Sequence, residues 1–146
     1  MNKDGYDLIV SADAKRFYFE SVGKRGCFQK QIAFVPIGRT SYNLALLDYD
    51  PNISDYSDLP VTDNGDMERV MATVINAIYE FFEMNPVATI YFAGNTPAKT
   101  RLYQAVINNC LDMGSKEFVI YGRQDDEWFP FTRSGRYTGF LIRKNA

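Results

Sequence analysis

Apolar and polar residues alternate through the first third of the chain, which is the pattern of half-buried β-strands. The alternation predicts strands at 16–22, 29–35 and 41–47. In the second of them, Lys30 shares a face with Ile32 and Phe34, and a turn at 23–26 precedes it. Because short turns join antiparallel neighbours, we expect a three-stranded meander, with residues 6–10 as a candidate edge strand.

Two later segments carry apolar residues at three- and four-residue spacing, as amphipathic helices do. The first stripe consists of Met67, Val70, Met71, Val74, Ile75, Ile78, Phe81 and Phe82. We expect Asp63 or Asn64 to cap this helix and Asn85–Pro86 to end it. The second helix is expected to begin with Thr96 as its cap and Pro97 as its first residue. Its expected buried stripe is Leu102, Ala105, Val106, Cys110 and Met113.

The remaining apolar runs predict four more strands, at 87–93, 117–121, 127–131 and 137–143. The expected order is β-β-β-α-β-α-β-β-β. This order indicates an α+β fold, in which a single, mainly antiparallel sheet carries two amphipathic helices on one face. A length of 146 residues is typical of one domain, so we expect residues 1–146 to form a single α+β domain.

Composition removes several classes of chemistry. The chain has no histidine, which excludes Ser-His-Asp and Cys-His catalysis and every histidine-containing metal site. Cys27 and Cys110 are predicted to act as small hydrophobes on a strand and a helix stripe, not as nucleophiles. No enzyme class is supported, no catalytic residue is identified and no cofactor is expected.

The start of the chain is polar and its longest apolar stretches are too short to span a bilayer, so we expect a cytoplasmic protein with no membrane association. The net charge of −2 is unevenly distributed: residues 41–90 hold nine acidic residues and one arginine. This distribution argues against a uniformly basic nucleic-acid binder but leaves one basic face open.

The turn at 93–101, AGNTPAKTR, is the segment most typical of a binding site. Glycine permits close approach of a ligand to the backbone, and free N–H groups at a helix start favour anions. The candidate anion-binding residues are Gly94, Asn95, Thr96, Lys99 and Arg101. The spacing matches neither a P-loop nor a dinucleotide fingerprint, so ordinary helix-start chemistry, with Lys99 and Arg101 as solvated surface charges, is the preferred interpretation.

Residues 48–66 contain six aspartates and are expected to form a solvated acidic loop. The spacing of an EF-hand fails, because Ile53 and Leu59 stand where glycine and glutamate are required. A looser magnesium site built from Asp48, Asp50, Asp63 and Asp66 is the less favoured alternative.

The C-terminal segment interleaves arginines, among them Arg133 and Arg136, with aromatic residues such as Trp128. Such a mixture can stack bases and neutralise phosphates. Strands select aromatic residues regardless of function, so an ordinary sheet core is the preferred interpretation.

Several segments together resemble a family of small proteins of unknown function found chiefly in Bacteroidetes. They are Phe17–Gly26, Tyr42–Ala45, Asn64–Val70, Ala72–Val74, Phe92–Thr96 and Lys99–Tyr103. The resemblance covers roughly residues 17–103. It implies a bacterial, cytosolic, single-domain protein and brings no activity, cofactor or catalytic residue. Small families of this kind often accompany mobile-element, defence or toxin–antitoxin loci, which is an association and not a mechanism.

The sequence therefore supports three hypotheses of function. The first is a non-enzymatic module that binds another protein, with a homodimer through an aromatic strand face as one form. The second is a nucleotide- or nucleic-acid-binding protein that uses the turn at Gly94–Arg101. The third is a magnesium-dependent phosphoryl-transfer or nuclease-like enzyme that uses the acidic loop.

Overall fold

A computed structural model describes residues 4–58, 64–94, 96–114 and 117–145 of the chain. The strands are β1 (Ile9–Val10), β2 (Arg16–Gly23), β3 (Gly26–Pro36), β4 (Ser41–Asp50), β5 (Asp55–Ser57), β6 (Thr89–Phe92), β7 (Phe118–Gln124), β8 (Glu127–Pro130) and β9 (Gly139–Lys144). The helices are α1 (Met67–Met84) and α2 (Pro97–Gly114). The predicted order of elements is confirmed, and β1 and β5 add two short strands to it.

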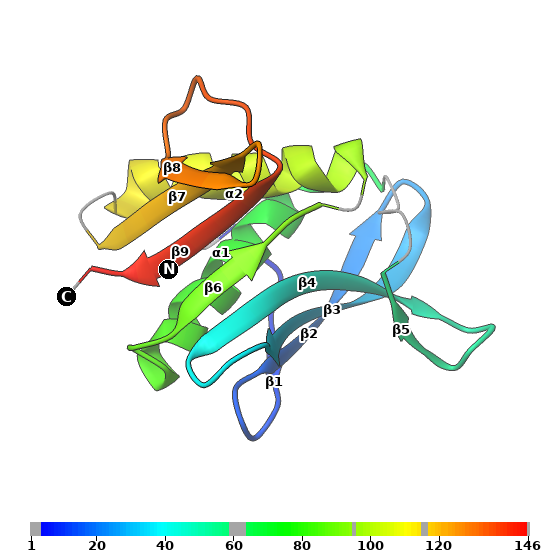
Figure 1. Ribbon diagram of the computed structural model, residues 1–146. Helices are drawn as coiled ribbons and strands as arrows, with labels where there is room; N and C mark the ends of the chain where they lie inside the picture. Colours follow the sequence, from blue (N-terminus) through cyan, green and yellow to red (C-terminus); the bar gives the residue numbers. More distant parts are fainter. Residues whose placement is uncertain (1–3, 59–63, 95, 115–116, 146) are drawn as a thin grey trace.

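All nine strands of the described residues belong to one sheet, in the order β1-β2-β3-β4-β6-β9-β7-β8, with β5 paired to β4 (Figure 1). The predicted meander is present as β2, β3 and β4, which are antiparallel neighbours. Among the strands of the described residues, only β4 and β6 run parallel to each other, and the segment between them contains α1. The last strand, β9, lies between β6 and β7.

Both helices pack against the same face of the sheet, as the amphipathic stripes predict. Phe81 of α1 stacks on Phe34 of β3 with ring centroids 4.1 Å apart. Tyr103 of α2 meets Phe92 of β6 edge-on at 5.2 Å. These residues belong to the buried core, and both helices lie behind the sheet in Figure 1. We call the opposite face, which carries Tyr91 and no helix of the described residues, the outer face.

The expectation of a loop over residues 48–66 is wrong for its first part. Strand β4 continues to Asp50 and turns back into β5, with Tyr49 opposite Tyr56. The rings of these two tyrosines contact each other at 5.4 Å, and Tyr18 contacts Tyr56 at 5.8 Å. Aromatic cross-strand contacts thus extend a segment whose aspartates suggested a loop.

The helix starts differ from expectation at α1 and agree at α2. Asp66, not Asn64, is the N-terminal cap residue of α1, and Asp63 lies outside the described residues. Asn64 instead accepts a hydrogen bond from the backbone N–H of Arg25 through its side-chain oxygen, at 2.7 Å. At α2, the hydroxyl of Thr96 accepts a hydrogen bond from the N–H of Lys99 at 3.2 Å, and Pro97 is the first helical residue.

The expected end of α1 at Asn85 is confirmed. None of the helices in the described part of the chain is long and apolar enough to cross a membrane.

Candidate anion-binding site

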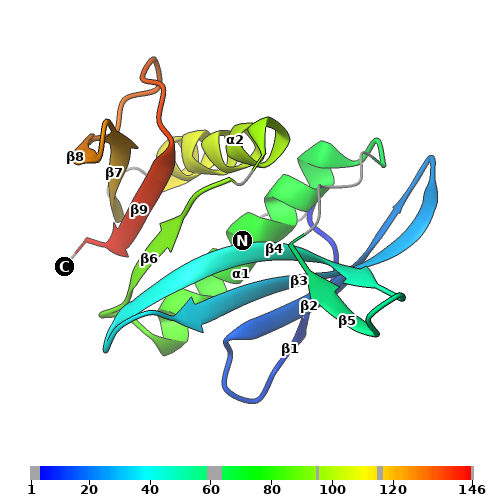
Figure 2. The same ribbon diagram turned by 45° about the vertical axis from the view of Figure 1, so that its right-hand side comes forward.

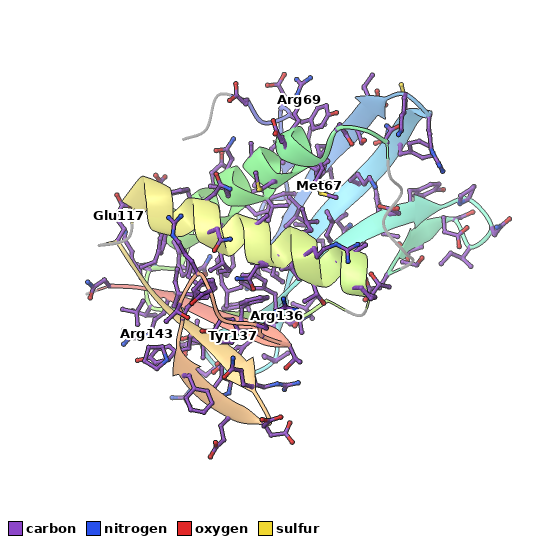
Figure 3. All side chains as sticks on the ribbon, turned by 90° about the horizontal axis from the view of Figure 1, so that it is seen from above. Met67, Arg69, Glu117, Arg136, Tyr137 and Arg143 are labelled. Carbon is purple, nitrogen blue, oxygen red and sulfur yellow. The ribbon has the colours of Figure 1, made fainter. Side chains whose placement is uncertain are left out.

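An open cleft of about 650 Å³ lies between the first half of α2 and the loop that joins β8 to β9. Its described lining includes three arginines, Arg101 from the helix and Arg133 and Arg136 from the loop, and no acidic residue. Figure 3 shows Arg136 and Tyr137 alongside α2. We call this the arginine cleft. Its side chains come from segments about thirty residues apart in the chain.

The floor of the arginine cleft is fixed by a close approach of two backbones. Gly94 follows β6, and a Cβ atom placed on it would lie 2.3 Å from the backbone nitrogen of Thr100 on α2. Only glycine leaves room for this contact. The N-terminus of α2, with its partial positive charge, is therefore held against the end of β6 and lines the cleft.

The arginine loop is held by Tyr137. A Cβ atom on either Gly122 or Gly135 would lie 2.3 Å from an atom of Tyr137, so its side chain fits only because both residues are glycine. The Tyr137 hydroxyl accepts a hydrogen bond from the backbone N–H of Thr132 at 2.9 Å. The side-chain amide of Gln124 donates another to the carbonyl oxygen of Arg136, also at 2.9 Å. These contacts fix the backbone that carries Arg133 and Arg136.

The chemistry of the arginine cleft suits an anion with several oxygens. A guanidinium group presents a planar set of N–H donors that matches phosphate in a bidentate manner. Arg101 and Arg136 beside a helix N-terminus supply positive charge to the cleft. The volume lies within the range of small-molecule sites.

Only some of the residues that the sequence predicted for the anion site line the arginine cleft. Gly94, Thr96 and Arg101 line the arginine cleft. Asn95 lies outside the described residues. Lys99 does not line the cleft: it is 2% exposed, and the expectation that it is a solvated surface charge is wrong.

Lys99 is buried because it lies on the apolar stripe of α2. The buried residues of the described half of that helix include Leu102, Tyr103, Val106 and Ile107, so position 99 is one turn before them on the same side. The buried stripe expected for α2 included Ala105 and omitted Tyr103 and Ile107. In the structure Ala105 is half-buried. The side chains of Cys110 and Met113 lie outside those described.

Strands β4 and β6 diverge beyond their paired residues (Figure 2), and Lys99 and Tyr103 of α2 contact Leu46 of β4 there. The two strands are paired only at Ser41–Asn43 and Thr89–Tyr91. Beyond that point, the Lys99 ammonium donates to the carbonyl oxygen of Leu46 at 2.8 Å, and the backbone N–H of Leu46 donates to the Tyr103 hydroxyl at 3.2 Å. Side chains of α2 thus satisfy backbone groups that β6 leaves unpaired.

These contacts have electrostatic consequences. Lys99 also forms an ion pair with Asp58. Burial raises the pKa of Tyr103 to about 12, against the lowering effect of its backbone hydrogen bond from Leu46. A second buried lysine, Lys30, pairs with Asp48 at 2.7 Å.

The acidic residues of the alternative metal site have other partners. Asp48 pairs with Lys30, and Asp50 accepts a hydrogen bond from the backbone N–H of Asn52. Asp66 accepts hydrogen bonds from the hydroxyls of Tyr6 at 2.6 Å and Ser21 at 2.5 Å. Asp63 lies outside the described residues. Within the described ranges, no three acidic or cysteine side chains form a group that could hold a metal ion.

Two further placements differ from the sequence analysis. Arg133 and Arg136 were grouped there with strand aromatics, whereas both lie in the loop before β9 and face α2. The sequence did contain a signal for this loop: Ser134 and Gly135, which lie between the two arginines, are typical of a turn. Cys27 is the second residue of β3 and is exposed, not buried.

A family model described as "Family of unknown function (DUF6934)" matches residues 2–145 of the chain. The match extends the resemblance noted over residues 17–103 to nearly the whole sequence. No curated protein and no solved structure matches the chain.

Proposed function

The chain thus belongs to the DUF6934 family, whose function is unknown, and from the arginine cleft we propose that it binds the phosphate groups of a nucleotide or a nucleic acid. One observation carries the proposal. Three arginines from two separate segments converge on one cleft at a helix N-terminus, and no acidic side chain lies among its described lining residues.

The arginines of the cleft lie on backbone segments that are held in place, unlike arginines that meet by chance on a mobile surface. The glycine contacts of Gly94 and Gly135 fix both sides of the cleft before a ligand arrives. A fixed site loses less conformational entropy on binding than a mobile one. The charges of Arg101 and Arg136 then contribute to binding with little reorganisation cost.

Titration calorimetry with ATP and with inorganic pyrophosphate tests this function. We expect binding that weakens with added salt, because phosphate contacts are electrostatic. Arg101→Ala and Arg136→Ala should each weaken it by roughly tenfold or more, as expected for the loss of a charge-assisted hydrogen bond.

Arg39→Ala is the matched control. Arg39 is an exposed arginine in the turn before β4, beside the start of β6, whereas Gly94 follows the end of β6. Absence of binding to both probes, or equal losses in all three variants, would overturn the proposal.

A second candidate function is non-enzymatic contact with another protein or a second copy of the chain. Exposed apolar side chains occur at the end of α1, which lines one pocket with Arg39 and Thr40 of the β3–β4 turn, and in that turn itself. Ile37 is 58% exposed, Met84 67% and Val87 77%. Exposed apolar patches often mark protein interfaces. Sedimentation equilibrium would show self-association that Val87→Glu abolishes; a monomer at all concentrations would leave only a different protein as partner.

We further propose that the protein works in a bacterial cytoplasm. The support is the free, exposed thiol of Cys27, which a reducing compartment preserves. The association with mobile-element or defence loci stays a prediction.

A further inference from the structure

Trp128 is the single tryptophan of the chain and lies on β8, on the outer face. Its side chain packs edge-on against Tyr91 of β6, with ring centroids 5.8 Å apart, yet the residue is 39% exposed. A tryptophan held in place by an aromatic neighbour and open to solvent can stack with a planar ligand.

Small residues connect the arginine cleft to Trp128. Gly94 lines the cleft, and Ala93 precedes it. A Cβ atom on Gly139 would lie 3.6 Å from the Cβ of Ala93 and 3.9 Å from the Cβ of Arg123. Arg123 is in turn the cross-strand partner of Trp128. Three residues between the cleft and the indole ring, Ala93, Gly94 and Gly139, therefore carry no side chain larger than a methyl group.

A basic residue also lies beside these small residues. Arg123 lies on the outer face beside Trp128, and its Nε atom is buried with no hydrogen-bond partner among the described residues. The adjoining β7–β8 turn and the first residue of β8 are acidic, with Asp125, Asp126 and Glu127. Arg123 is therefore the basic group that lies between the arginine cleft and Trp128.

We propose that the ligand of the arginine cleft is a single-stranded nucleic acid, with its phosphates on Arg101 and Arg136 and an adjacent base stacked on Trp128. This inference rests on the proposed function and names its ligand class. A mononucleotide would fill the cleft without reaching the outer face. A duplex keeps its bases stacked on each other and offers none to the indole ring.

Intrinsic fluorescence provides the test, because Trp128 is the only tryptophan. An oligothymidine of about ten nucleotides, within the usual site size of such proteins, should quench it. Trp128→Ala should weaken oligothymidine binding about tenfold, measured by anisotropy of a labelled strand, and should leave ATP binding unchanged. Trp128→Phe should restore most of the affinity.

Phe129→Ala is the matched control. Phe129 is 40% exposed on the same strand but points to the opposite side, so its removal should not affect either probe. Quenching of the unaltered protein does not depend on whether Trp128→Ala folds.

The outcomes separate this inference from the proposed function. If Arg101→Ala weakens ATP binding while oligothymidine binds no more tightly than ATP and leaves the fluorescence unchanged, the single-strand inference is wrong and the function stands. Equal binding of a duplex of the same length would also overturn it. If neither ATP, pyrophosphate nor oligothymidine binds, both proposals fail.

Discussion

The ammonium group of Lys99 on α2 donates a hydrogen bond to the backbone carbonyl oxygen of Leu46 on β4, across 2.8 Å. A charged side chain therefore completes the hydrogen bonding of a sheet strand at the place where its parallel neighbour diverges. The lysine is 2% exposed, and its ammonium group also forms an ion pair with Asp58, so both polar contacts compensate for its burial.

The first prediction concerns this contact. Lys99→Met should lower the free energy of unfolding by about 2 kcal/mol, because it leaves the buried carbonyl oxygen of Leu46 without its donor. Urea denaturation measures the change. Arg101→Met, two residues away on an exposed position, should cost less than about 1 kcal/mol. Equal losses in the two variants would contradict the structural role of Lys99.

The second prediction concerns the close approach at Gly94. Gly94→Ala should destabilise the protein by roughly 1–3 kcal/mol, because the new methyl group collides with the backbone of Thr100. Gly38→Ala is the matched control: its nearest neighbour would be a side-chain atom of Ser41 at 3.5 Å, an ordinary contact. Thermal melts that shift equally for both substitutions would show that the packing at Gly94 is looser than described.

The third prediction follows from the raised pKa of Tyr103, about 12, which burial causes. Above about pH 10 this tyrosine ionises in the unfolded chain but stays protonated in the folded one. The unfolded state then binds fewer protons, so the free energy of unfolding should fall as the pH rises from 10 towards 12.

Urea midpoints measured across that range test the linkage. Tyr103→Phe should flatten the alkaline decline and should also cost about 1 kcal/mol at neutral pH, since the N–H of Leu46 loses its acceptor. An unchanged alkaline slope in the variant would show that other groups cause the decline.

The fourth prediction concerns metal ions. Millimolar magnesium should leave the melting temperature unchanged, because Asp48 is paired with Lys30 and Asp66 with two hydroxyl groups. A ligand at 100 times its dissociation constant would stabilise the fold by about 2.7 kcal/mol, which a melt detects. Stabilisation that Asp50→Ala removes would revive the magnesium hypothesis.

The periodicity of the sequence was sufficient to predict the order of elements and the core. Val74, Ile78 and Phe81 recur at helical spacing, and the structure buries all three completely. The face shared by Lys30, Ile32 and Phe34 was also predicted from alternation. The burial of Lys30 could not be predicted from this alternation. It depends on the ion pair with Asp48, which lies eighteen residues later in the chain.

Only one side of the arginine cleft could be predicted from the local sequence. Thr96 and Pro97 carry a recognisable helix-start signal, and Gly94 is predictable as a close contact. The facing arginines are different: Arg133 and Arg136 reach α2 only because Gly122 and Gly135 leave space for Tyr137. That contact forms through the tertiary fold, and neither hydrophobic periodicity nor the motif spacing reports it.

The position of β9 has a consequence for how the protein is made. This strand is the last of the nine to be synthesised, yet it pairs with β6 on one side and β7 on the other. Until a ribosome has released residues 139–144, the strands of the growing chain form two sheets that are not hydrogen-bonded to each other, each with an edge of unpaired backbone N–H and C=O groups. Stalled or prematurely terminated translation should therefore yield no partly active product, and loss of these few residues should be as damaging as loss of the whole C-terminal third.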